Sequence, residues 1–218
     1  MIAFAPDVGP ANAVKVIQFE RSMGFFWEPA WQQWAVSAGR WLPTLLNWVY
    51  VLGFFPLGLA IAFTAYFLDR RRYLRYRNVI FVSFAVALVV FVLLPLAPPR
   101  LTEGYGFIDT IALYGPAWYD TRNSMAYYNA FAAMPSLHFG WACLFGAYFF
   151  RSGSPWLKAV GVAYPAAMFL AITVTGNHYI VDGIAGILLI GASFLAYNAL
   201  AGLAAMGHTR QARGATHR

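Results

Sequence analysis

Two short polar motifs interrupt otherwise apolar sequence. The motif MPSLHFGWA contains Ser136 and His138, and the motif TGNHYIVDGIAG contains His178 and Asp182. On a helix the spacing of four between His178 and Asp182 puts both side chains on one face, where a carboxylate fixes the imidazole tautomer and raises the basicity of its free nitrogen. A histidine prepared in this way can act as a base or a nucleophile. The alternative interpretation is a polar pair that only pins helices together.

Ser136 and His138 follow Pro135, a residue that favours the first turn of a helix. Free N–H groups and the positive end of the helix dipole make a helix N-terminus an anion site. A hydroxyl there adds a donor, and a histidine with an ordinary pKa of about 6.5 can deliver a proton. Taken alone, Ser136 is also explained as a helix cap and His138 as a membrane-interface residue.

Arginine supplies the remaining chemistry. Arg100 follows the sequence LAPP, and its guanidinium matches a phosphate bidentately. Arg122, in YDTRNS, is a second candidate; either residue could instead only anchor a span. Phosphoryl transfer needs charge neutralisation, a nucleophile and an acid for the leaving group, and the residues above supply each role without requiring a metal.

The composition is that of an integral membrane protein. Of 218 residues, 61% are hydrophobic and 11% charged, against about a quarter charged in an average soluble domain. Several stretches approach ~20 apolar residues, the length of a membrane-spanning helix. The net charge of +7 comes mainly from arginines that cluster between apolar runs, which favours a membrane partner over nucleic acid.

The apolar runs predict an all-α, polytopic transmembrane helix bundle with five to six spans. The segment DRRRYLRYR at 69–77 carries five arginines, so the positive-inside rule places it in the cytoplasm. The two polar motifs and Arg100 then fall on the extracytoplasmic face. The five clearest spans are approximately 43–68, 79–97, 136–150, 157–175 and 179–203.

The predicted domain organisation has three parts. Residues 14–42 mix tryptophans with charges, which is typical of an amphipathic helix lying at the membrane interface; a sixth, poorly hydrophobic span is the alternative. The three parts are an N-terminal interfacial segment (1–42), a membrane-embedded catalytic domain (43–203) and a basic cytoplasmic tail (204–218).

The motifs P-S-L-H and H-Y-x-x-D, at 135–138 and 178–182, resemble the second and third signature motifs of the type 2 phosphatidic acid phosphatase superfamily. The similarity is closest to the branch that contains inositol-phosphorylceramide synthases. PLAPPRL, ending at Leu101, fits the first motif of that branch. The resemblance extends over residues from about 43 to 203.

The resemblance implies a role for each site residue. His178 would attack phosphorus to form a phosphohistidine, with Asp182 orienting it. His138 would protonate the departing oxygen, while Arg100 and Ser136 would hold the phosphate. Such enzymes use no metal and no other cofactor.

Two departures from the superfamily pattern concern its cations. A lysine seven residues before the first-motif arginine is here Leu93, and a Ser-Arg pair before the nucleophile is here Ala171 and Ile172. Three residues are candidates to supply the missing contacts: Arg122 as a cation, with Asn129 and Asn177 as hydrogen-bonding helpers.

The sequence thus predicts an enzyme that cleaves or transfers a phosphoryl-linked group of a lipid phosphate or phosphodiester lipid at the extracytoplasmic face of a bacterial inner (plasma) membrane. Water as acceptor makes it a phosphatase, and an alcohol head group makes it a phosphotransferase; the sequence leaves both open. Two rivals remain: a metal-dependent or serine-type intramembrane hydrolase using Ser136 with a histidine, and a non-catalytic transporter or scaffold.

Overall fold

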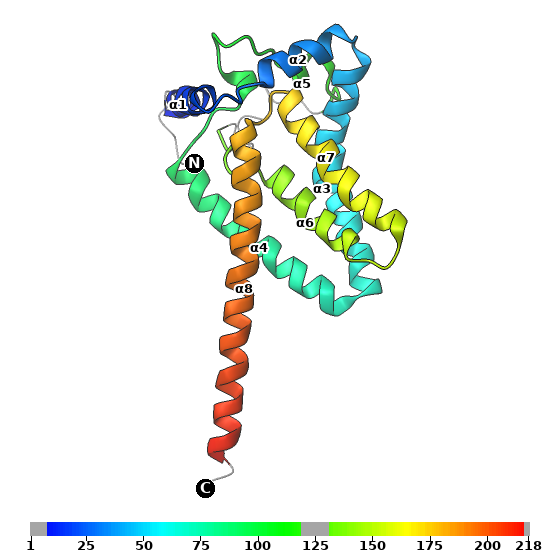
Figure 1. Ribbon diagram of the computed structural model, residues 1–218, viewed down its shortest axis with the longest axis vertical. Coiled ribbons are helices and arrows are strands. Elements are labelled where there is room, and N and C mark those ends of the chain that lie inside the picture. The colour runs from blue at the N-terminus through cyan, green and yellow to red at the C-terminus, as the bar shows by residue number, and fades with distance from the viewer. Residues whose placement is uncertain (1–7, 119–130, 216–218) are drawn as a thin grey trace.

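The computed structural model describes residues 8–118 and 131–215, with side chains described through residue 202. Within these ranges the chain is helical and forms no strand, which confirms the predicted all-α class. Its elements (Figure 1) are α1 (Val8–Ser22), α2 (Glu28–Ser37), α3 (Trp41–Leu68), α4 (Arg70–Leu93), the 3-10 helix η1 (Pro99–Leu101), α5 (Thr110–Tyr114), α6 (Leu137–Phe150), α7 (Pro155–Val174) and α8 (Ile180–Ala215).

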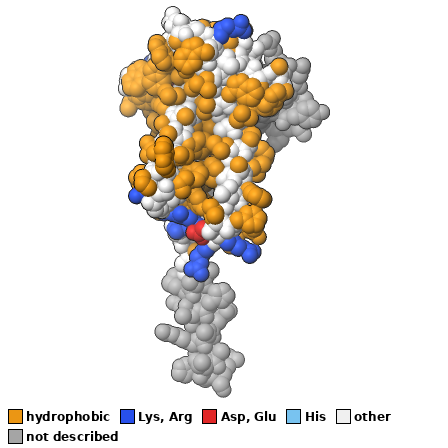
Figure 2. All heavy atoms as spheres, turned by 90° about the vertical axis from the view of Figure 1, so that its right-hand side faces the viewer, with side chains coloured by type: hydrophobic (Ala, Val, Ile, Leu, Met, Phe, Trp, Pro, Cys, Tyr) orange, Lys and Arg blue, Asp and Glu red, His pale blue; other side chains and the backbone are white. Residues whose placement is uncertain are grey.

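Four helices are long and apolar enough to cross a membrane: α3, α4, α7 and the Ile180–Gly202 part of α8. Their most apolar windows are only 22% to 33% buried inside the protein. The remaining apolar side chains form a broad hydrophobic surface (Figure 2). A surface of this kind needs a lipid environment, so the chain is a multi-pass membrane protein.

Helix α6 is shorter than the span predicted at 136–150. It has 14 residues, or about 21 Å of helix, against a hydrocarbon core of about 30 Å. Its buried side, which includes Leu144 and Phe145, packs among the longer helices. The segment is therefore helical as predicted, but it does not have the length of a fifth complete span.

The arginine-rich segment at 69–77, which lies between two of the predicted spans, is helical. Asp69 is the N-cap residue of α4, and its Oδ1 accepts a hydrogen bond from the N–H of Arg72 at 2.9 Å. An aspartate cap stabilises a helix start at this position, so the arginines form the first turns of α4. Lys and Arg side chains gather at that end of the molecule (Figure 2).

The N-terminal segment forms two helices where one interfacial helix was predicted. Helices α1 and α2 are separated by a turn at Gly24, whose φ is 78°. Together with α5 they lie over one end of the bundle (Figure 1). Ala13 and Ile17 of α1 are fully buried in a cluster with Tyr179, which immediately precedes α8.

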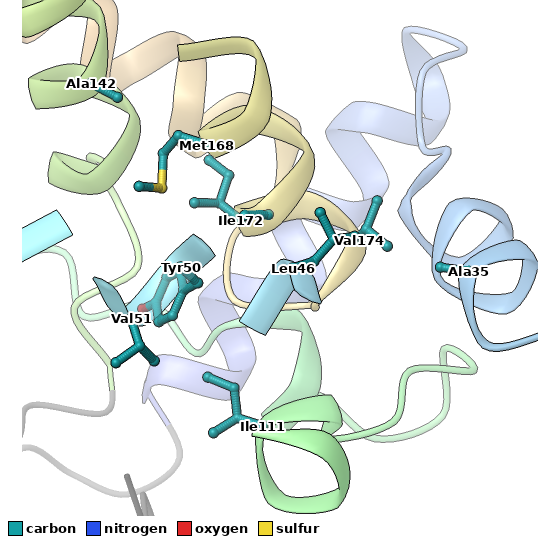
Figure 3. Packing of buried hydrophobic residues seen from close by; sticks show 10 residues of the cluster. Ala35, Leu46, Tyr50, Val51, Ile111, Ala142, Met168, Ile172 and Val174 are labelled. Atoms are coloured by element: carbon teal, nitrogen blue, oxygen red, sulfur yellow. The ribbon is translucent and has the colours of Figure 1, made fainter. Parts of the chain in front are cut away.

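The main core lies between α3, α6 and α7. Tyr50 of α3 packs with Met168 and Ile172 of α7 and with Ala142 of α6 (Figure 3). Ala35 of α2 belongs to the same cluster. The N-terminal helices are thus tied into the core that supports the polar motifs.

Paired glycines set the close crossings of α6. A Cβ on Gly140 would lie 2.9 Å from the carbonyl oxygen of Gly186 in α8. Likewise, a Cβ on Gly146 would lie 2.5 Å from the carbonyl oxygen of Gly161 in α7. Small residues let membrane helices approach closely, and here they fix α6 between the two helices that flank the second polar motif.

Replacing Gly186 by Ala is expected to separate α6 from α8, because the added Cβ would clash with the carbonyl oxygen of Ser136. Overpacking of this type costs about 1–3 kcal/mol, so thermal unfolding in detergent should begin at a lower temperature. Gly191→Ala is the matched control on the same helix, since a Cβ there meets nothing within 4 Å. Equal unfolding temperatures for the two variants would contradict the proposed close crossing.

Candidate active site

Backbone hydrogen bonds join the motif segments to one another. The N–H of Arg100 donates to the carbonyl of Gly176 at 2.8 Å, and the N–H of Ser136 donates to the carbonyl of Asp182 at 2.9 Å. Gly176 has a φ of 72°, and a Cβ there would come within 2.9 Å of Nε2 of Gln32. The turn after α7 therefore needs a glycine, and it brings all three motif segments together.

His178 is held by the carbonyl of Ala133. Its Nδ1 lies 2.8 Å from that oxygen and 3.5 Å from Oδ2 of Asp182. Because a carbonyl oxygen can only accept, Nδ1 carries the hydrogen, and the lone pair of Nε2 is left for chemistry. The side chain is almost fully buried, at 4% exposure of the residue.

The pairing of His178 with Asp182 does not arise from a shared helix face, as the sequence analysis assumed. Helix α8 begins at Ile180, so His178 lies before it. Asp182 is in the first turn of α8, and its Oδ2 accepts the N–H of Tyr179 at 2.9 Å. An acid at the third position of a helix that accepts the N–H of the N-cap residue makes one of the two hydrogen bonds of a capping box. This bond also holds Oδ2 of Asp182 near the imidazole of His178.

His138 lies in the first turn of α6, between two aromatic rings of α3. Its ring centroid is 4.2 Å from that of Tyr50 and 4.0 Å from that of Phe54, with both pairs stacked. The centroids of His138 and His178 are 5.5 Å apart. The two imidazoles are therefore close enough to contact one phosphoryl group. Sequence analysis did not identify the aromatic pair, since aromatic residues within an apolar span are common.

Arg100 is oriented by two acceptors. Its Nε donates to Oδ1 of Asn177 at 3.0 Å, and its Nη1 donates to Oδ2 of Asp109 at 3.2 Å. Its side chain is only 3% exposed. Asn177 is in turn fixed by Thr175, whose Oγ1 accepts from Nδ2 at 2.6 Å. Asn177 thus holds the arginine in this structure, and Asp109 is a contact that the sequence gave no reason to expect.

A small pocket lies beside the side chains of Arg100, Asn177 and His178. Its volume is about 10 Å³, which is room for about one water molecule. Binding of a phosphate group therefore requires the pocket to widen. The lining residues are Tyr50, Pro98, Arg100, Ala132, Ala133, Asn177 and His178.

Ser136 is fully buried. It is the N-cap residue of α6, and its Oγ accepts from the N–H of Phe139 at 3.4 Å. The hydroxyl hydrogen is still available as a donor. Two other predicted phosphate contacts, Arg122 and Asn129, lie outside the described residues.

Three positions at which the superfamily pattern has Lys, Ser and Arg carry apolar side chains in this protein. Leu93, at the end of α4, is 76% exposed. Ala171 and Ile172 are fully buried in the core. The carbonyl of Ile172 accepts the N–H groups of Asn177 and His178, each at 3.0 Å, so this position shapes the turn that carries the histidine.

The start of α8 is contacted by two glutamates that sequence analysis assigned to the interfacial segment. Oε1 of Glu28 accepts the N–H of Ile180 at 2.8 Å, and Oε1 of Glu20 accepts the N–H of Val181 at 2.9 Å. Burial, reinforced by the charge of Glu28, raises the pKa of Glu20 to about 9. Burial also raises the pKa of Glu28.

Four apolar helices with a histidine- and arginine-containing pocket at one end define a multi-pass membrane protein with a polar site. A family model described as the PAP2 superfamily matches residues 14–196, and the chain belongs to that superfamily. Neither the curated proteins nor the solved structures compared with it give a match. Superfamily membership together with the apolar helices fits a membrane phosphatase that acts on a phosphate ester.

Arg100→Lys is expected to lower kcat/KM for phosphate release by about 10²-fold, because losing a transition-state donor typically costs about that much. An ammonium cannot donate to Asn177, to Asp109 and to a phosphate in the fixed fork of a guanidinium. Arg151→Lys, in the exposed turn after α6, is the matched control and should retain wild-type activity. Full activity of Arg100→Lys would show that the fork geometry is not used.

Proposed function

We propose that this protein is a metal-independent lipid phosphate phosphatase or lipid head-group phosphotransferase that works through a phosphohistidine at His178. The observation that carries the proposal is that the imidazole of His178 and the buried guanidinium of Arg100 line one small pocket, with the ring centroid of His138 5.5 Å from that of His178. These are the groups that attack, protonation and charge neutralisation require in phosphoryl transfer.

In the first step Nε2 of His178 attacks phosphorus, and the bond from phosphorus to the lipid oxygen breaks. His138 gives a proton to that departing oxygen, and Arg100 neutralises the charge on the phosphoryl oxygens. In the second step the acceptor oxygen attacks the phosphohistidine, the P–N bond breaks, and His138 takes the acceptor's proton. Ala133 and Asp182 keep the Nδ1 hydrogen of the nucleophile in place throughout.

An apolar cavity supports a lipid as the substrate. It has a volume of about 270 Å³ and lies between α3, α4 and α6. Phe54 lines this cavity and also stacks on His138. A substrate with its phosphate at the histidines could therefore extend a hydrocarbon chain along the cavity, past Trp141 and Ile80.

The proposed orientation places the pocket on the extracytoplasmic side. The arginines at the start of α4 lie at the end of the bundle opposite α1, α2 and α5 (Figure 1). By the positive-inside rule that end faces the cytoplasm. We include α6 as a fifth, shortened crossing, and we assign the protein to a bacterial plasma membrane, with residues 204–218 as a cytoplasmic tail.

The motifs P-S-L-H and H-Y-x-x-D support placement near the inositol-phosphorylceramide synthase branch, in which an alcohol accepts the transferred group. Hydrolysis and transfer share the first step, so they are separated by the acceptor and not by the nucleophile. Both activities are therefore retained as outcomes of one experiment.

The experiment measures products from purified protein in detergent with EDTA. A panel of lipid phosphates is supplied alone and then, for a labelled phosphodiester lipid, with candidate alcohols. Inorganic phosphate identifies a phosphatase, and a new labelled lipid that forms only with an alcohol identifies a transferase. Loss of all activity with EDTA, restored by a divalent metal, would contradict the proposal in favour of a metal-dependent hydrolase.

A further inference from the structure

Two glutamates from different helices converge on the first turn of α8. Glu20 of α1 and Glu28 of α2 are both fully buried, although they lie more than 150 positions away from α8 along the chain. Charged residues are almost never fully buried unless they are paired. The positions of these two carboxyl groups therefore call for a specific function.

Their partners are the backbone donors that a helix start leaves without intrahelical acceptors. Glu28 accepts from Ile180 and Glu20 accepts from Val181. Asp182 accepts from Tyr179, the residue before the helix. Three consecutive N–H groups are thus each bound by a carboxyl oxygen, and the acids also complement the positive end of the helix dipole.

The two glutamates also interact with each other. Oε2 of Glu20 and Oε2 of Glu28 are both buried and have no hydrogen-bond donor among the described residues. Two ionised carboxylates cannot bond to each other, because each can only accept. A proton on Glu20, whose pKa is raised to about 9 by burial and by the charge of Glu28, would supply such a donor. The titratable groups facing the pair are Asp182 and Tyr179, and the charge of Asp182 further raises the pKa of Glu20.

The contacts continue from this pair to both histidines. The first turn of α8 contains Asp182, whose Oδ2 lies 3.5 Å from Nδ1 of His178. The carbonyl of Asp182 accepts the N–H of Ser136, which begins the helix that carries His138. A rotation or fraying of the start of α8 would therefore move the imidazoles of His178 and His138 relative to Arg100.

We propose that Glu20 and Glu28 are positioning residues: their buried carboxyl groups bind the N–H groups of Val181 and Ile180, clamp the first turn of α8 and so align His178 for attack. This inference rests on the proposed function for its kinetic consequence. The clamp itself is a property of the fold and can be measured without a substrate.

The first test measures deuterium uptake at the backbone amides of residues 178–182 in detergent. Each lost hydrogen bond to a charged partner should speed exchange by about tenfold or more, so Glu28→Ala and Glu20→Ala are expected to exchange faster there. Glu20→Gln keeps an acceptor for Val181 and a donor for Glu28 and should match the wild type. The exposed residue Glu103 provides the control Glu103→Gln. Unchanged exchange in both alanine variants would overturn the inference.

The second test measures phosphate release from phosphatidic acid micelles. Misplacing a catalytic group by about 1 Å can cost about 10²-fold in rate, so Glu28→Ala should lower kcat by up to that factor with KM little changed. A merely structural role would instead reduce the amount of folded protein and leave kcat per folded molecule unaltered. That outcome, measured on protein purified by size exclusion, would overturn the inference.

The pH profile gives a third readout. The pKa of Glu20 rises from 4.5 to about 9 on folding, so its contribution to the clamp is complete below pH 4.5 and is lost as pH rises through 9. The ratio of the wild-type kcat to the kcat of Glu20→Gln, in which residue 20 does not titrate, should therefore fall above that pH. An identical alkaline limb in the two proteins would count against the proton on Glu20.

These experiments distinguish a failure of the proposed function from a failure of the glutamate clamp. If the wild type and His178→Ala release equal amounts of phosphate, or neither releases any, the proposed function fails on this substrate while the exchange data still decide the clamp. If His178→Ala is inactive and the glutamate variants match the wild type in exchange and kcat, the clamp alone is rejected.

Discussion

His178→Ala should abolish phosphoryl transfer, with a loss of about 10⁴-fold or more in kcat. Removal of a nucleophile eliminates the covalent step itself, and only binding and charge neutralisation by Arg100 remain. Among the described residues the imidazole contacts only the carbonyl of Ala133 and the carboxylate of Asp182 through polar atoms, so folding is expected to survive. The measurement is product formation from the best lipid of the panel, with EDTA present.

Two variants control this prediction. His208→Ala changes a histidine near the end of α8 and should leave activity unchanged. Ser136→Ala removes an N-cap, which costs about 1 kcal/mol of stability, and should lose much less activity than His178→Ala. If Ser136→Ala is as inactive as His178→Ala, the serine-type hydrolase becomes the better account.

His138→Asn should lower turnover of a lipid phosphate by about 10²–10⁴-fold, the usual contribution of a general acid. The reason is that an alkoxide leaving group needs a proton as the P–O bond breaks. An aryl phosphate such as p-nitrophenyl phosphate has a good leaving group and does not need that proton. Its turnover should therefore fall far less in the same variant.

The comparison of the two substrates is the decisive part of the His138 experiment. Equal losses on the lipid and on the aryl phosphate would contradict a general-acid role and would favour a packing role between Tyr50 and Phe54. The control is Phe54→Leu, which keeps the imidazole. Because Phe54 also lines the apolar cavity, its replacement should affect the lipid mainly through KM, while kcat for both substrates should change little.

The meeting of the polar motifs could be predicted from sequence because their residues stand out chemically. Ser136, His138, His178 and Asp182 are polar groups at the starts of apolar helices, where burial is costly and a partner is required. Their order and spacing also match superfamily motifs. The structure places Arg100 and His178 at one pocket, although helices α5, α6 and α7 lie between them along the chain.

Long-range contacts could not be predicted in the same way. Glu20 and Glu28 stand among tryptophans, and their local sequence is typical of a membrane interface; only the fold shows that they reach the start of α8. The predicted spans leave the arginines after Asp69 outside a helix, whereas the structure has them in the first turns of α4. Charge patterns give orientation, whereas caps decide where a helix begins.

The most direct test of the account is to trap the intermediate on the protein. The enzyme is mixed with its fastest lipid substrate, quenched in alkali, in which a phosphohistidine survives, and the peptide containing residues 176–186 is analysed by mass spectrometry. We expect one phosphoryl group on His178 that disappears when the quench is delayed past substrate exhaustion. A phosphoryl group on Ser136, or product formation with His178 unmodified at every time, would contradict the phosphohistidine mechanism.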